Sequence, residues 1–147
     1  MSVKVAPKSC ALKALDDAKK DLSRDKYLIP VAFIIADDEV LDFNLQFEDR
    51  ELKLSVYSKL VELAKAKNAK AIITINDANM TDALGKDRAG LPNECIFVTV
   101  SGPNIPTWTL SVSYRREGSE IIFEKPIESQ DDILNLLPGW TKSPIPS

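Results

Sequence analysis

The side chains best suited to chemistry are concentrated at the start of the stretch from Asn76 to Asn93, which has no clear helix or strand pattern. Connections in compact domains have a median length of about four to six residues, and much longer ones are often functional or mobile. We therefore expect a loop here, with its polar side chains forming a candidate site. The residues of this candidate loop site are Asn76, Asp77, Asn79, Thr81 and Asp82.

Carboxylates are the metal-binding groups that the chain has in quantity. Asp37 and Asp38 could join Asp77 around a magnesium ion, because metal-assisted hydrolysis requires only oxygen ligands. Acidic residues at a hairpin turn are more often simple turn-formers, and Asp77 can form an Asx-turn while Thr81 or Asp82 caps a short helix. We therefore predict no metal and no other cofactor, and we assign no catalytic residue.

The 147 residues include no histidine. This excludes Ser-His-Asp and Cys-His catalytic arrangements and zinc sites built on histidine. Cys10 and Cys95 are far apart in sequence and lack a CxxC or neighbouring base, so we expect both to be buried small hydrophobes. Isolated cysteines are typical of a reducing compartment, which favours a cytoplasmic location.

The charge balance argues against nucleic acid and membranes as partners. Lysine and arginine number 19 against 22 acidic residues, with a sequence pI near 5.1, which gives no general attraction to polyanions. The longest apolar run, Tyr27 to Ala36, is about half of what a membrane span requires. Arg115, Arg116 and Lys125 could form a small basic patch, but a solvated rim is the simpler interpretation.

Periodicity predicts two helices, six strands and a last helix. A segment is predicted to be helical where apolar residues recur at intervals of three and four residues. It is predicted to be a strand where apolar and polar residues alternate or where β-branched residues are frequent. Ser9 is a good N-cap for the first helix, Asn68 a C-cap for the second, and Ser129 an N-cap for the third. The expected elements are a helix over 9–23, strands over 27–36 and 40–47, a helix over 49–67, strands over 69–75, 94–101, 107–116 and 119–124, and a helix over 130–137.

This order, α-β-β-α-β-β-β-β-α, predicts a single α+β domain over residues 1–147, with a mixed, mostly antiparallel sheet and helices packed on it. Residues 1–8 and 141–147 are expected to be flexible tails. In the strand over 107–116 the core face is predicted to consist of Trp108, Leu110, Val112 and Tyr114.

The opposite face of that strand is a candidate interface because it is small, uncharged and β-prone: Thr107, Thr109, Ser111 and Ser113. We expect a homodimer held through a sheet edge or through this face, with Trp140 as a second candidate. The preferred function is a non-catalytic protein-binding or self-associating module, with no enzyme activity. The alternative is a divalent-metal-dependent hydrolase or nuclease that uses Asp37, Asp38, Asp77 and Asp82.

Overall fold

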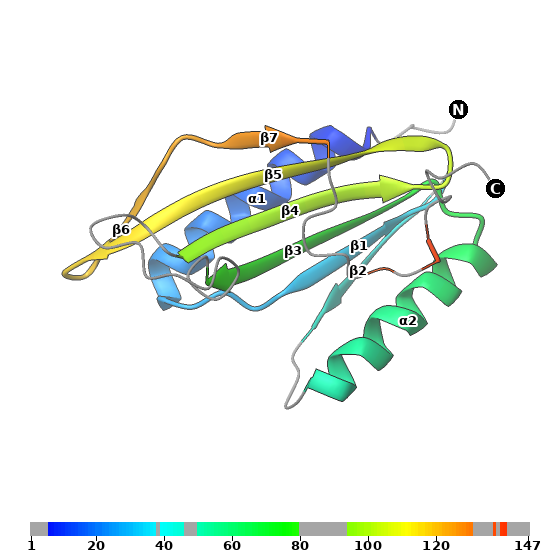
Figure 1. Cartoon of the computed structure of the whole chain (residues 1–147), viewed down its shortest axis with the longest axis horizontal. Helices are drawn as coiled ribbons and strands as arrows, with labels where there is room; N and C mark the ends of the chain where they lie inside the picture. The colour runs from blue at the N-terminus through cyan, green and yellow to red at the C-terminus, as the bar shows by residue number, and fades with distance from the viewer. Residues whose placement is uncertain are drawn as a thin grey trace.

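The computed structural model describes residues 6–37, 39–45, 50–79, 94–130, 137, 139 and 140, with the backbone alone at 50–54 and 78–79. Within these residues, two helices and a seven-stranded sheet form an α+β fold (Figure 1). The elements are α1 (Pro7–Asp25), β1 (Val31–Ile35), β2 (Val40–Asn44), α2 (Arg50–Ala66), β3 (Ala71–Asn79), β4 (Glu94–Gly102), β5 (Ile105–Glu117), β6 (Glu120–Phe123) and β7 (Ile127–Ser129).

Every pairing in the sheet is antiparallel, in the order β2-β1-β3-β4-β5-β6. The long strand β5 has two neighbours on its outer side: its first half pairs with β7 and its second half with β6. β5 is therefore an interior strand, and the edges of the sheet are β2 on one side and β6 with β7 on the other.

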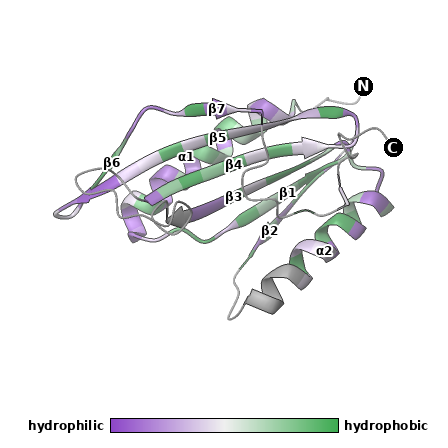
Figure 2. Cartoon of the chain, viewed as in Figure 1, coloured by the Kyte–Doolittle hydropathy of each residue, from purple (hydrophilic) through white to green (hydrophobic). Residues whose placement is uncertain are grey.

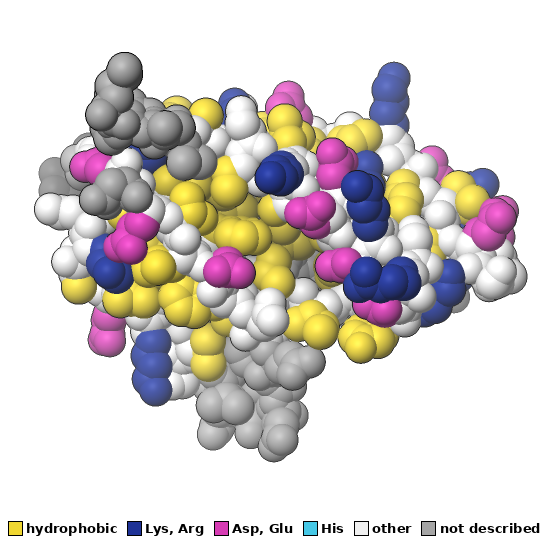
Figure 3. Space-filling model, turned by 180° about the vertical axis from the view of Figure 1, so that it is seen from behind, with side chains coloured by type: hydrophobic (Ala, Val, Ile, Leu, Met, Phe, Trp, Pro, Cys, Tyr) yellow, Lys and Arg dark blue, Asp and Glu magenta, His cyan; other side chains and the backbone are white. Residues whose placement is uncertain are grey.

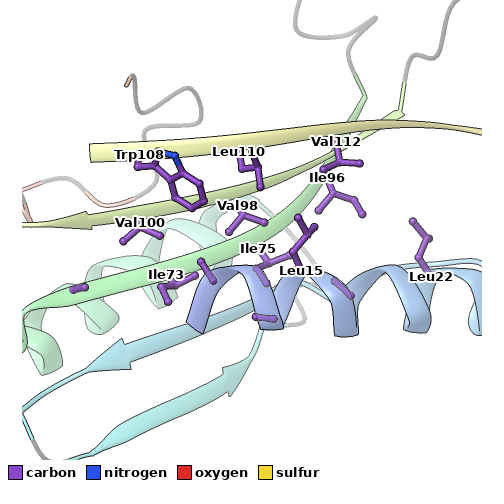
Figure 4. Close-up of a cluster of buried hydrophobic side chains, with 14 of the residues drawn as sticks. Leu15, Leu22, Ile73, Ile75, Ile96, Val98, Val100, Trp108, Leu110 and Val112 are labelled. Atoms are coloured by element: carbon purple, nitrogen blue, oxygen red, sulfur yellow. The ribbon is translucent and has the colours of Figure 1, made fainter. Parts of the chain in front are cut away.

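The two helices cover opposite faces of the sheet. On one face, α1 packs against alternating residues of the four central strands (Figure 4). On the other, α2 packs against β1, β2 and β3 together with Leu137 and Trp140. The β-branched run of β1 is buried on both faces of the sheet, where Ala32 and Ile34 face α2 and Ile35 faces α1. The tip between β5 and β6 is hydrophilic (Figure 2).

Helix α1 begins two residues earlier than expected. Pro7 occupies its first turn, where a missing N–H costs nothing, and Ala6 precedes it without a side-chain cap. Ser9 therefore lies inside the helix and is not its N-cap, and Pro7 and Lys8 are not part of a tail. The helical spacing buries Ala11, Ala14, Leu15, Ala18 and Leu22. Lys26 ends the helix in the left-handed conformation, with its N–H donating to Leu22 O at 2.8 Å.

The main differences from the expected strands are at three places. β1 begins only after Pro30, which has no N–H to donate to a ladder. β3 continues to Asn79, so the stretch we expected to be a loop begins as a strand. Residues 127–129 form β7, which makes Ser129 a strand residue and not a helix cap. The interior of the helix expected over 130–137 lies outside the described residues, as do residues 1–5 and 141–147.

The remaining elements follow the pattern that the sequence predicts. Asn68, the predicted C-cap, lies just beyond the last residue of α2 and adopts the left-handed conformation common at helix C-termini, with a φ of 54°. The alternating residues Leu41, Phe43 and Leu45 face α2, while Asp42 and Asn44 are exposed. No helix in the described part of the chain is long and apolar enough to cross a membrane.

Candidate functional site

Asp77 and Tyr114 are joined by a hydrogen bond across β4. Asp77 lies opposite Ile96 of β4, and Tyr114 of β5 lies opposite Glu94. Side chains alternate along a strand, so all of these project from the face that α1 covers. The Tyr114 hydroxyl donates to Asp77 Oδ1 at 2.8 Å. Tyr114 is completely buried, whereas Asp77 keeps part of its surface exposed.

Arg116 completes this cluster of Asp77, Glu94, Tyr114 and Arg116. Its guanidinium binds both carboxylate oxygens of Glu94, with Nε 2.9 Å from Oε2 and Nη2 3.2 Å from Oε1. Nη1 donates to Lys26 O at 2.8 Å, at the end of α1. The same guanidinium lies over the Tyr114 ring, 5.8 Å from its centroid. Arg116 thus connects α1 to both β4 and β5.

The electrostatics of the cluster keep Tyr114 as the donor and Asp77 as the acceptor. Burial raises the pKa of Tyr114, and the hydrogen bond to Asp77 raises it further. Burial of its protein-facing side also raises the pKa of Asp77, against the lowering effect of the Tyr114 hydrogen bond. The Tyr114 hydroxyl and the Arg116 guanidinium already have hydrogen-bond partners within the protein. The cluster therefore holds β3, β4 and β5 together near the end of β3.

Asn76, the neighbour of Asp77, points to the opposite face of the sheet. The hydroxyl of Tyr57 in α2 donates to Asn76 Oδ1 at 2.8 Å, inside the core. Burial raises the pKa of Tyr57 to about 12, so this hydroxyl too remains protonated. Asn76 Nδ2 is buried and has no hydrogen-bond partner among the residues that the structure describes. Asn76 therefore couples α2 to β3 and cannot share a ligand with Asp77.

The residues of the candidate loop site do not converge in the described part of the chain. Asn76 and Asp77 lie on opposite faces, and Asp77 is a strand residue bound to Tyr114, not the turn-former we expected. The side chain of Asn79 and all of Thr81 and Asp82 lie outside the described residues.

The carboxylates of the expected metal cluster are separated. Asp37 follows β1 beyond the pair Ile35–Ala71, whereas Asp77 lies six positions further along β3, a distance of roughly 20 Å. Asp38 is outside the described residues. Among the residues that the structure describes, no three acidic or cysteine side chains lie close enough to hold a metal ion.

The small-residue face of β5 is less open than expected. Thr109 is fully buried, and its hydroxyl lies 3.2 Å from Thr99 Oγ1. Thr107, Ser111 and Ser113 are half-buried. Since both sides of β5 are paired, this strand cannot accept an added one. By contrast, the predicted core face of Trp108, Leu110, Val112 and Tyr114 is confirmed as buried.

Trp140 is not an open docking residue. Its side chain is 3% exposed within the α2-side core, and its indole N–H donates to Ser101 O at 2.9 Å. The two arginines of the possible basic patch are paired and exposed, since Arg115 pairs with Glu117 and Glu124 while Arg116 pairs with Glu94. Of the two cysteines, Cys95 is buried as expected, and Cys10 is half-buried at the edge of the α1-side core.

One of the two edges of the sheet in the described structure is the outer side of β2. Leu45 N donates to Pro30 O at 2.7 Å, and Ala36 N donates to Glu39 O at 2.9 Å. In an antiparallel pair the bonded positions alternate, so Leu41, Phe43 and Leu45 direct their backbone groups toward β1. Val40, Asp42 and Asn44 must then direct their N–H and C=O groups away from the sheet, and all three are exposed.

A groove runs beside this edge, between β2 and α2. Its volume is about 430 Å³, and its walls are mainly apolar with Lys59 at the rim. The lining residues are Asp42, Phe43, Asn44 and Leu45 of β2 and Val56, Lys59, Leu60 and Leu63 of α2. Sequence reasoning missed this site because periodicity identifies a strand but does not reveal which strand lies at an edge.

No protein-family model, curated protein or solved structure matches this chain.

Proposed function

We propose that this protein is a protein-binding module that accepts an extended segment of a partner as an additional strand on β2. The observation that carries the proposal is the combination of outward-facing backbone groups at Val40, Asp42 and Asn44 with the apolar groove beside them. In strand addition the main-chain hydrogen bonds supply affinity, and pockets for alternate side chains supply specificity. β2 and its groove offer both.

The register indicates what the partner segment should contain. Residues of an added strand that lie opposite Leu41 and Phe43 would project toward α2, where the groove accepts apolar side chains. The residue opposite Asp42 would project from the other face, beside an exposed carboxylate. Opposite charges in such cross-strand pairs are favourable. The expected ligand is thus an extended segment with apolar residues at alternate positions and a lysine or arginine between them.

The carboxylate of Asp42 also makes a different protein a more favourable partner for β2 than a second copy of this chain. If two copies paired their β2 strands about an axis at Asp42, the two carboxylates would lie directly opposite each other. Like charges in that position destabilise the pair. A basic partner residue removes this repulsion and gains an ion pair.

Selection from a random octapeptide library displayed on phage tests the proposal. We expect enrichment of peptides in which apolar residues alternate and a basic residue occupies one intervening position. Asp42→Pro should abolish binding, because proline removes an outward N–H while leaving the inward ladder to β1 intact. Asp42→Ala is the matched control, since it keeps the N–H and should retain weaker binding.

Two results would contradict the proposal. One is enrichment of peptides whose binding is equal for the native protein and Asp42→Pro, and the other is no enrichment at all. Sedimentation equilibrium separately tests which molecule pairs with the edge of β2. A dimer that Asp42→Pro converts to a 16.3 kDa monomer would show that a second copy takes the edge, as the sequence led us to expect, and not a different partner.

A further inference from the structure

A second pocket lies at the opposite side of the molecule from the β2 groove, where α1 begins. It has a volume of about 380 Å³. One wall is the first turn of α1, with Pro7 and Lys8, and the other is formed by the end of β4 and the start of β5. Hydrophobic side chains gather toward this end of the face that carries α1 (Figure 3).

The interior of this pocket is apolar. Val100, Ile105, Pro106 and Trp108 supply its surface, and Val100 and Trp108 are themselves buried in the α1-side core. The Trp108 ring is held in place because its indole N–H donates to Glu128 Oε1 at 2.8 Å. A pocket of this size, with fixed apolar walls and few polar groups, is typical of small-molecule sites.

Lys8 is the charged residue among the described residues that line the pocket. Lys8 Nζ lies 5.2 Å from the centre of the Trp108 ring, and no described acidic side chain pairs with it. The first turn of α1 contains no acidic residue, so nothing there offsets the partial positive charge of the helix end. The described lining residues include no Asp or Glu, and the carboxylate of Glu128 lies outside the lining, where it accepts from the Trp108 indole N–H. An anionic group would therefore be favoured at the mouth, and a cationic one disfavoured.

We propose that this pocket binds a small organic carboxylate with an apolar body, its charged group beside Lys8 and its apolar part against Trp108 and Ile105. This site is separate from the β2 edge, and neither proposal depends on the other. An aliphatic and an aromatic acid share the required chemistry.

The test compares three compounds that share a seven-carbon alkyl chain and differ in the head group: octanoate, heptan-1-ol and heptylammonium. Binding is followed by the NMR signal of the Trp108 indole N–H, which lies in the pocket wall. We expect saturable shifts at millimolar ligand, with octanoate binding about threefold more tightly than heptan-1-ol and heptylammonium weakest, as an exposed ion pair would give. Lys8→Gln should make octanoate and heptan-1-ol equal.

Two variants serve as controls. Lys13→Gln makes the same change of charge on an exposed residue of α1 outside the pocket, and should leave the preference for octanoate intact. Ala6→Phe fills the pocket from an exposed lining position and should abolish all binding without loss of thermal stability. No shift of the Trp108 signal with any compound would overturn the site. Equal effects of Lys8→Gln and Lys13→Gln, or binding unchanged by Ala6→Phe, would do the same.

Discussion

The hydroxyl of Tyr114 lies 2.8 Å from Asp77 Oδ1 and thereby connects β5 to β3 across the strand between them. Tyr114 has no exposed surface, so its hydroxyl must find a partner inside the protein. Asp77 supplies that partner from a residue that keeps some contact with solvent. This bond explains why β3 remains a strand to Asn79, beyond the point where its apolar alternation ends.

Asp77→Ala should destabilise the protein by about 1 to 3 kcal/mol, because it leaves the buried Tyr114 hydroxyl without its acceptor. Tyr114→Phe in the same background should then have a smaller effect than it has alone. The measurement is urea unfolding of the two single variants and the double variant. If the losses in free energy of unfolding from the two single variants simply add up in the double variant, a direct bond between these residues is contradicted.

Asp77 should also make stability depend on pH in a defined direction. Its pKa is raised in the folded state, mainly by burial, so the folded protein holds this proton more tightly than the unfolded chain does. The stabilisation is complete below the ordinary pKa of an aspartate and is lost as the pH rises through the folded-state pKa.

Asp77→Asn should remove that dependence, because the amide oxygen still accepts from Tyr114 while the desolvated charge is gone. Thermal unfolding of the native protein and the variant across the acidic range is the measurement. At neutral pH the variant should be at least as stable as the native protein. A variant that keeps the full acid dependence would show that another group causes it.

The sequence predicted the elements more reliably than their arrangement. The alternation of apolar and polar residues located β2 and β5, because a strand that buries one face repeats its pattern every two residues. It failed at the end of β3, where the side-chain oxygens of Asp77 and Asn76 accept hydrogen bonds from Tyr114 and Tyr57 of distant segments. The local sequence pattern around a residue does not reveal partners that lie far away along the chain.

The same reason accounts for the missed sites. The small-residue face of β5 was predicted to be open, yet Thr109 is buried beside Thr99, and β7 and β6 occupy the outer side of the strand. Which strand is an edge depends on the order of strands in space. The β2 groove and the pocket beside Trp108 each combine residues from distant parts of the chain, so neither leaves a contiguous motif.

Thr109→Lys should destabilise the protein strongly, by more than about 3 kcal/mol, because it places an unpaired charge at a fully buried position. Ser111→Lys, two residues along on the same face, should cost less, since that position is half-buried and its lysine can extend to solvent. Circular dichroism during urea unfolding measures both. A Thr109→Lys protein of native stability would mean that this face is open after all.

Millimolar magnesium chloride should leave the melting temperature unchanged. The described residues bring no three acidic or cysteine side chains together, and Asp37 and Asp77 are far apart. A ligand that binds only the folded state raises the melting temperature as its concentration exceeds its dissociation constant. A magnesium-dependent rise that Asp77→Asn removes would instead support the metal-dependent hydrolase.

The last prediction concerns the register of β2, on which the proposed strand addition depends. Leu45→Ala should cost about 2 to 5 kcal/mol, because Leu45 is 4% exposed in the α2-side core. Phe43→Ala should cost about 2 kcal/mol, since this ring is only half-buried at the groove. Asn44→Ala should be nearly neutral, because its side chain is exposed and only its backbone faces the open edge. Unfolding in urea compares the three, and an Asn44→Ala loss equal to that of Leu45→Ala would shift the register by one residue and turn the apolar side chains of β2 away from the groove.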